Sequence, residues 1–133
     1  MNIFLVIAAS LSTFMIGFLA HGPVTGKLWM SLANIHPTSN EKFSEMIPQM
    51  LWNLLANFVT AFMLAVMINI SFMALGERSV GIGILVAVGT WLGFIVTSSS
   101  IEVIWMGRKV SLWLFECIVS LICFTVMGTI LSL

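Results

Sequence analysis

"TSSSIEVIWMGRKVSLWLFE" (Thr97 to Glu116) joins two apolar runs through a turn of three residues, Gly107 to Lys109. A connection this short forces the two flanking helices to lie side by side and antiparallel. Each flanking run supplies the roughly 20 mostly apolar residues that a transmembrane helix needs. The stretch therefore predicts a transmembrane hairpin, with one acid on each arm, Glu102 and Glu116, at similar distances from the turn.

The composition indicates that the whole chain, and not this hairpin alone, is a membrane protein. Its 133 residues are 60% hydrophobic and 8% charged, with a mean hydropathy of +1.15. A soluble domain carries roughly 25% charged residues, so this composition excludes a soluble domain. The formal net charge is zero, so nothing indicates nucleic acid or an acidic partner. Cys117 and Cys123 match no metal or redox motif, and no cofactor is expected.

Four stretches are long and apolar enough to cross a bilayer, at about residues 1–20, 50–75, 80–106 and 110–133. The first has no Lys or Arg before its apolar run, which favours a retained helix over a signal peptide. The second and third are joined by only four residues, Gly76 to Ser79. The sequence therefore predicts an all-α polytopic membrane protein, with four transmembrane helices in one antiparallel bundle that forms a single domain over 1–133.

The segment 21–49 is too long and too mixed to be a simple turn. Three apolar side chains recur in it at helical spacing, Leu28, Leu32 and Ile35. This pattern predicts an amphipathic helix that lies in the membrane interface. Thr38 and Glu41 then stand at capping-box spacing before a short helix, and Pro48 is expected to open the second transmembrane helix.

The basic residues indicate an orientation. If the helices alternate, one side of the membrane receives Lys27, Lys42, Arg108 and Lys109, and the other receives Arg78. The positive-inside rule then predicts a multi-pass membrane protein with the segment 21–49 and the turn 107–109 in the cytoplasm and both termini outside. The bias is modest, so single and dual insertion both stay open. Four tryptophans fall near the basic side, as in an aromatic belt, namely Trp29, Trp52, Trp105 and Trp113.

Glu102 and Glu116 each lie roughly 10 Å from the turn at ~1.5 Å per residue, so they are expected in one layer near the cytoplasmic interface. An acid inside a membrane is costly and is by default a functional hypothesis. One interpretation is a shared proton or cation site. The other is structural, with Glu102 bonded to Arg108 or Lys109 and Glu116 paired with Lys27 or a loop amide. Both interpretations stay open.

Further polar side chains are predicted in this layer. One face of the second helix carries Gln49, Asn53, Asn57 and Thr60, and the other helices add His21, Ser98, Ser99 and Ser120. Together they form either a polar vestibule open to the cytoplasm or hydrogen-bonding contacts between helices, which contribute about 0.6 kcal/mol each on average.

Small residues predict close helix packing, within one chain or between copies. The third helix carries Gly89 and Gly93 four residues apart, and the first carries Ala9, Thr13 and Gly17 at the same period. We therefore expect a homo-oligomer, or another membrane protein as partner, within the lipid bilayer.

The hypothesis that this layer favours is a small oligomeric channel or transporter for protons, a cation or a small solute. One alternative is a structural or accessory subunit of a membrane complex, and another is a lipid-binding protein. No motif of a serine hydrolase, a zinc peptidase or a phosphate-binding loop is present, so an enzyme is not predicted.

Several stretches carry a family resemblance, namely "GFLAHGPVTGKLWM" (17–30), "WLGF" (91–94) and "MGRKVSLWLFECIVSLICFTVMGTIL" (106–131). They resemble the small bacterial four-helix membrane proteins classed as a domain of unknown function, family 1761. The matching positions are Gly17, Pro23, Gly26, Lys27, Trp29, Trp91, Gly93, Gly107, Arg108, Met127 and Gly128. The resemblance implies the four-helix topology, a location in the bacterial inner membrane, and mostly architectural roles for these residues. It implies no activity.

Overall fold

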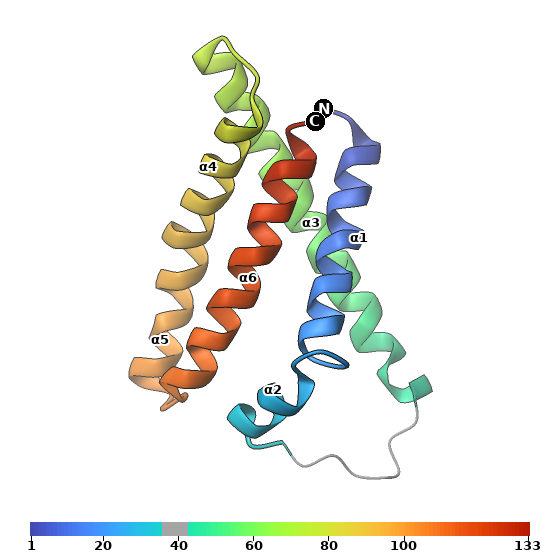
Figure 1. Ribbon diagram of the computed structural model, residues 1–133, viewed down its shortest axis with the longest axis vertical. Coiled ribbons are helices and arrows are strands. Elements are labelled where there is room, and N and C mark those ends of the chain that lie inside the picture. The colour runs from blue at the N-terminus through green and yellow to red at the C-terminus, as the bar shows by residue number, and fades with distance from the viewer. Residues whose placement is uncertain (36–42) are drawn as a thin grey trace.

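The protein is described by a computed structural model over residues 1–35 and 43–133. Its helices are α1 (Ile3–Ala20), α2 (Gly26–Ala33), α3 (Phe43–Leu75), α4 (Val80–Thr90), the π-helix η1 (Trp91–Val96), α5 (Thr97–Trp105) and α6 (Val110–Leu131) (Figure 1). Four continuous spans are long and apolar enough to cross a membrane: α1, α3, α4–η1–α5 and α6. The predicted all-α fold with four spans is confirmed.

The helix ends follow from local chemistry. The Asn2 side chain caps α1 by accepting from the Phe4 N–H at 2.9 Å, and the Ser79 hydroxyl caps α4 by accepting from the Ile82 N–H at 3.2 Å. The turns after α3 and α5 contain Gly76 and Gly107 at φ +73° and +67°. Only glycine adopts this left-handed conformation without steric cost, so both tight turns depend on these glycines.

The start of α3 differs from the prediction. The helix already begins at Phe43, and Pro48 lies inside it, so the prediction that Pro48 opens the helix was wrong. Pro48 lies in the second turn of α3, so the helix lacks the one backbone hydrogen bond that an N–H there would donate to the Ser44 carbonyl, and it continues on both sides. The predicted capping box of Thr38 and Glu41 lies outside the described residues.

The predicted amphipathic helix is present as α2, and it ends at Asn34, which adopts a left-handed conformation with φ 56°. Gly26 at its start is buried, and a Cβ added there would lie 3.1 Å from the His21 carbonyl oxygen. The connection between α1 and α2 is therefore tight. The tight connection places α2 directly beneath the end of α1. Its position in the membrane interface stays a prediction.

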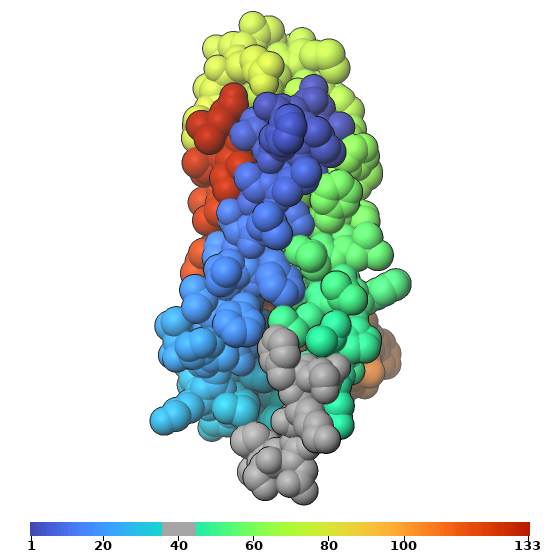
Figure 2. Space-filling model, turned by 90° about the vertical axis from the view of Figure 1, so that its right-hand side faces the viewer, coloured from blue at the N-terminus to red at the C-terminus, as the bar shows by residue number. Residues whose placement is uncertain are grey.

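The bundle has a closed end and an open end. Both termini and the Gly76–Ser79 connection lie at one end, where α3 packs against α4 (Figure 1). Toward the end that holds α2, the first half of α3 diverges from η1–α5, and among the described residues α3 contacts neither of these two elements. Figure 2 shows the side on which α1 and α3 lie next to each other. We call these ends the terminal end and the α2 end.

The core occupies the terminal end and the middle of the bundle. Its most buried side chains come from α1, α3, α4 and α6: Val6, Ala9, Ala61, Leu64, Ala65, Ile68, Ala87 and Met127. Helices α4 and α6 approach closely, because a Cβ on Gly128 would lie 2.8 Å from the Gly83 carbonyl oxygen. The glycines therefore allow two backbones to touch, as small residues do in membrane proteins.

The predicted packing glycines lie elsewhere. A Cβ added at Gly17, Gly89 or Gly93 would meet no atom of residues 1–35 and 43–133 within 4 Å. Close approach at these positions is therefore not found in the described part of the chain, and packing between copies through them stays a prediction.

Candidate functional site

An ionisable pair joins the end of α1 to the first half of α6. His21 is the residue at which α1 ends, and Glu116 lies about two turns into α6. The His21 Nε2 atom lies 3.1 Å from Glu116 Oε1 and 3.2 Å from Oε2. Both side chains are about one-third exposed. Because α1 and α6 pack along their length, this contact between residues 95 positions apart in sequence is a product of the helix crossing.

The second ring nitrogen of His21 defines the protonation of the pair. Nδ1 lies 2.8 Å from the Gly17 carbonyl oxygen, which only accepts, so Nδ1 carries a hydrogen. A hydrogen bond between Nε2 and the Glu116 carboxylate needs one further proton. It resides on Nε2 as an imidazolium–carboxylate pair, or on the acid with neutral imidazole as acceptor. In both arrangements the pair holds one exchangeable proton and has no net charge.

The surroundings favour the protonated imidazole. The hydrogen bond to Glu116 raises the pKa of His21 above its ordinary value, against the opposing effect of burial, and the bond to Gly17 adds to the rise. The Trp29 ring meets the imidazole edge-on at 4.8 Å between centroids, and the Phe115 ring does so at 6.0 Å. The two aromatic rings hold the imidazole in the orientation that points Nε2 at Glu116.

The pair lines a cleft of about 730 Å³ between α1, α2, α3, η1 and α6, which we call the central cleft. Its polar lining consists of Thr13, His21, Asn53, Asn57, Thr60, Glu116 and Ser120. The lining residues at the α2 end, such as Phe18, Met46 and Asn53, are exposed, whereas Thr13, Phe124 and Met127 are buried. The cleft is therefore open at the α2 end and ends against the core.

The polar face that the sequence predicted on the second transmembrane helix, which is α3, lies only partly in this cleft. Asn53, Asn57 and Thr60 line it, and Asn57 donates to the Asn53 side-chain oxygen at 3.3 Å. Gln49 is exposed and is not among the lining residues.

The two predicted acids, Glu102 and Glu116, have separate partners. Glu102 accepts from the Arg108 guanidinium, as the structural interpretation expected, and it does not line the central cleft. Glu116 has His21 as its partner instead of the expected Lys27 or loop amide. Ser98 bonds to the Phe94 carbonyl of its own helix. Glu116 pairs with His21 because α1 crosses α6, which brings this histidine closer to Glu116 than any lysine of the described chain.

The remaining predicted residues lie around the α2 end. Trp52 and Trp105 are exposed, as are Lys27 and Lys109, while Trp113 donates from its indole to Ser99 Oγ at 2.8 Å. A membrane-interface role for these tryptophans and cations stays a prediction.

Sequence reasoning missed the role of Trp91. Its indole N–H donates to Ser120 Oγ at 2.9 Å and also lies 3.2 Å from the Cys117 carbonyl oxygen, which ties the π-helix to α6. The available signal was Ser120 itself, a hydroxyl in an apolar helix opposite the "WLGF" stretch.

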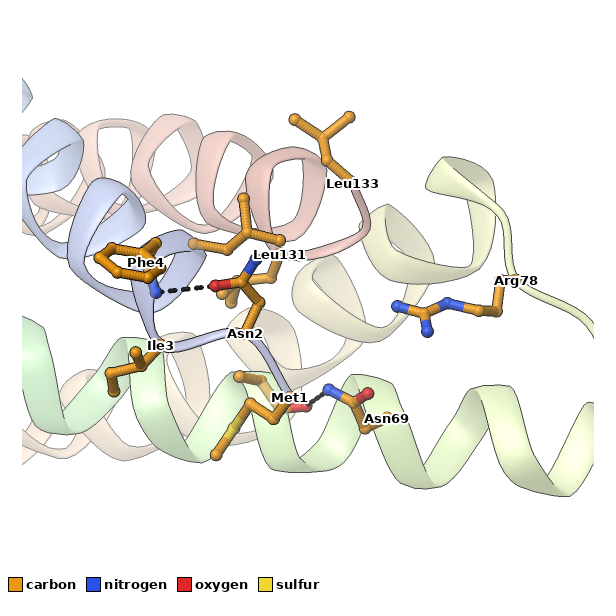
Figure 3. A pocket seen from close by; sticks show the side chains of 10 residues that line it. Met1, Asn2, Ile3, Phe4, Asn69, Arg78, Leu131 and Leu133 are labelled. Atoms are coloured by element: carbon orange, nitrogen blue, oxygen red, sulfur yellow. Dashed lines mark hydrogen bonds between the residues drawn. The ribbon is translucent and has the colours of Figure 1, made fainter.

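A second hollow of about 560 Å³ lies at the terminal end (Figure 3). Asn2, Asn69 and Arg78 give it polar atoms, and Asn69 donates to the Ala65 carbonyl at 2.7 Å. The Arg78 guanidinium lies 5.2 Å from the centre of the Phe72 ring. Ala65 and Leu131, which line this hollow, are buried in the core. The packed core therefore separates the two hollows.

Four apolar spans arranged as one bundle define a multi-pass integral membrane protein. Residues 4–132 match the family described as "Protein of unknown function (DUF1761)", and the chain belongs to this family. The resemblance noted from the sequence is thereby confirmed. No curated protein and no solved structure matches the chain.

The residues that carried the resemblance have physical roles in this fold. Gly107 forms the turn before α6, Trp91 bonds to α6, and Gly128 makes the close crossing with α4. Met127 is 2% exposed within the core. These roles are architectural, as the resemblance implied.

Proposed function

We propose that this protein is a small membrane carrier that binds a solute in the central cleft and couples binding to the proton of the His21–Glu116 pair. The observation that carries this proposal is the position of the pair. It lines a cleft that is open at one end and closed at the other, between transmembrane helices. An ionisable group in such a place is typical of substrate pathways and proton relays.

The size of the central cleft suits a small molecule. Its volume of about 730 Å³ lies within the range of roughly 300–1,000 Å³ that is common for small-molecule sites. Its lining is largely apolar, with a few convergent polar groups, which is the usual composition of such sites.

The second hollow supports a carrier over a channel. A channel needs a continuous polar path, whereas here the core residues Leu64, Ala65 and Ile68 are at most 2% exposed between the two hollows. A carrier needs one closed barrier at a time, with the opposite side open. Under the positive-inside expectation the central cleft faces the cytoplasm, and the Asn69–Arg78 hollow marks the opposite exit.

Reconstituted vesicles containing the pH-sensitive dye pyranine test this proposal. A panel of one quaternary ammonium, one carboxylate and one neutral alcohol is added outside, and the lumenal pH is followed. We expect one solute class to change the lumenal pH with wild-type protein and with Glu102→Gln, but not with Glu116→Gln or in protein-free vesicles. Glu102 is the matched control because its carboxylate is bonded to Arg108 outside the cleft.

The proposal fails if folded wild-type protein gives no solute-dependent pH change with any member of the panel. It also fails if Glu116→Gln responds like the wild type.

A second candidate is an accessory subunit or homo-oligomer, favoured by the divergence of α3 from η1–α5. The third span leaves Leu92, Phe94 and Ile104 exposed by 55%, 66% and 71%, and Gly93 between them has open space. Light scattering of the purified protein in detergent distinguishes a monomer from an oligomer. Gly93→Leu should weaken an oligomer that packs through this face, whereas Met73→Leu, at an exposed position on α3, should not.

A further inference from the structure

We propose that the solute of the central cleft is a monovalent organic cation with an apolar body, which takes the place of the proton of the His21–Glu116 pair. This inference rests on the carrier function proposed above and adds the chemical class of its substrate.

The charges in the cleft favour a cation. Among the described residues, Glu116 is the one acid that lines it, and His21 is the one basic group. Arg108 bonds Glu102, Lys27 and Lys109 are exposed, and Arg78 lies in the other hollow. Once His21 is neutral, the charge that remains in the cleft is negative.

The apolar lining also suits a cation. Phe14, Phe18, Trp29 and Phe124 surround the space, and Met46, Met50 and Met127 add polarisable thioethers. Aromatic faces attract cations within about 6 Å of the ring centre, by roughly 0.5–2 kcal/mol depending on desolvation. Methionine adapts to irregular ligand shapes. An anion of the same shape would meet the negative faces of these rings and the Glu116 carboxylate.

The exchange conserves charge. Before binding, one proton is held between Nε2 and the carboxylate. When the cation pairs with the carboxylate, His21 releases its Nε2 proton to water and keeps the Nδ1 hydrogen on the Gly17 carbonyl. The occupied cleft then contains one cation, one carboxylate and a neutral imidazole. If the proton stayed, the cleft would carry a net positive charge in a medium of low dielectric, which is unfavourable.

Other titratable groups near the pair do not replace this proton. Arg108 acts on Glu116 through space from the turn before α6, but its guanidinium is bonded to Glu102. Lys27 on α2 is exposed. Cys117 and Cys123 on α6 are free cysteines, of which Cys123 lines the cleft. The imidazole is therefore the group that exchanges its proton.

Tetraphenylphosphonium, a permanent monovalent cation, tests the proposal with purified full-length protein in detergent. Tetraphenylborate has the same shape and the opposite charge. Calorimetry should detect cation binding, and a pH indicator in weak buffer should detect about one released proton per bound cation at a pH above the ordinary histidine value of 6.5 and below the raised pKa of His21. We expect Glu116→Gln to lower the affinity about tenfold or more and to abolish proton release, since the charge partner is lost. Glu102→Gln should bind like the wild type.

His21→Gln provides a second variant that keeps the acid. It should bind the cation without releasing a proton, so it separates the base from the acid even if Glu116→Gln does not fold. Equal binding of tetraphenylborate, unchanged affinity in Glu116→Gln, or binding of the cation by wild type without proton release would each overturn the proposal.

The substrate class and the carrier function fail differently. If tetraphenylphosphonium does not bind but the pyranine assay responds to another solute, the substrate class is wrong and the carrier function stands. If the cation binds and releases a proton but never changes lumenal pH, the binding site stands and the carrier function is wrong.

Discussion

The two ends of this bundle are built from the same apolar composition and differ in how closely the helices meet. At the terminal end, Gly83 and Gly128 let α4 and α6 touch, and the core side chains exclude solvent. At the α2 end, α3 leaves η1–α5, and the polar groups of His21, Asn57 and Glu116 face the resulting cleft. In a membrane protein, packing depends on shape more than on hydrophobicity, because lipid is as apolar as the core.

Closure of the terminal end can be broken at one glycine. Gly128→Ala places a methyl group 2.7 Å from the Ala87 Cβ and 2.8 Å from the Gly83 carbonyl oxygen, so the helices must separate. We expect a loss of about 1–3 kcal/mol of stability, as overpacking costs in other cores. Gly89→Ala is the control, because a Cβ there meets nothing within 4 Å. Thermal unfolding in detergent measures both, and equal stability of the two variants would contradict the assigned crossing.

The bond between the two helices at the α2 end can be measured by a double-mutant cycle. His21→Ala and Glu116→Ala each leave a partly buried polar group without its partner, and we expect a coupling energy of about 1 kcal/mol. The pair Glu102→Ala and Arg108→Ala is the matched comparison, with smaller coupling because it joins one helix to its own turn near the surface. A coupling energy of zero between His21 and Glu116 would mean that their contact does not stabilise the packing of α1 against α6 at the cleft.

The pair should also make stability depend on pH. The pKa of His21 is raised in the folded protein by its bond to Glu116, so the folded state holds this proton more tightly than the unfolded state. The stabilisation is complete below the ordinary histidine pKa of 6.5 and is lost as the pH rises through the raised value. Melting temperatures measured from pH 5 to 9 should fall over that window in the wild type, and His21→Gln should remove this part of the fall.

The smallest effect is expected where the π-helix meets α6. Trp91→Phe keeps the ring but removes the N–H that bonds Ser120, which should cost about 0.5–1 kcal/mol. Trp105→Phe is the control, because Trp105 is 80% exposed. If both variants unfold at the same temperature, the indole bond does not contribute to the position of the third span.

The elements that depend on local sequence could be predicted. Apolar length gave the four spans, and the short turns at Gly76 and Gly107 gave their antiparallel order. The Arg108 bond to Glu102 was also expected, because both residues lie within one turn region. The preference of proline for the first position of a helix placed the start of α3 at Pro48, which was wrong, because α3 begins at Phe43 and contains Pro48.

The elements that depend on helix crossings could not be predicted. His21 and Glu116 meet because α1 crosses α6, and no spacing in the sequence encodes that contact. The close crossing uses one glycine from each of two helices, Gly83 and Gly128, whereas the small-residue motif in the sequence pairs two glycines of one helix, Gly89 and Gly93. The π-helix at 91–96 has no sequence signature that we recognise.

The neutrality of the His21–Glu116 pair has a consequence for energetics across the membrane. A membrane potential acts on net charge, with about 2.3 kcal/mol per elementary charge per 100 mV. A site that holds either one proton or one monovalent cation against the same carboxylate has the same charge in both states. Under the proposed exchange, the membrane voltage would therefore do no work, and the direction of the exchange would follow from the two concentration gradients alone.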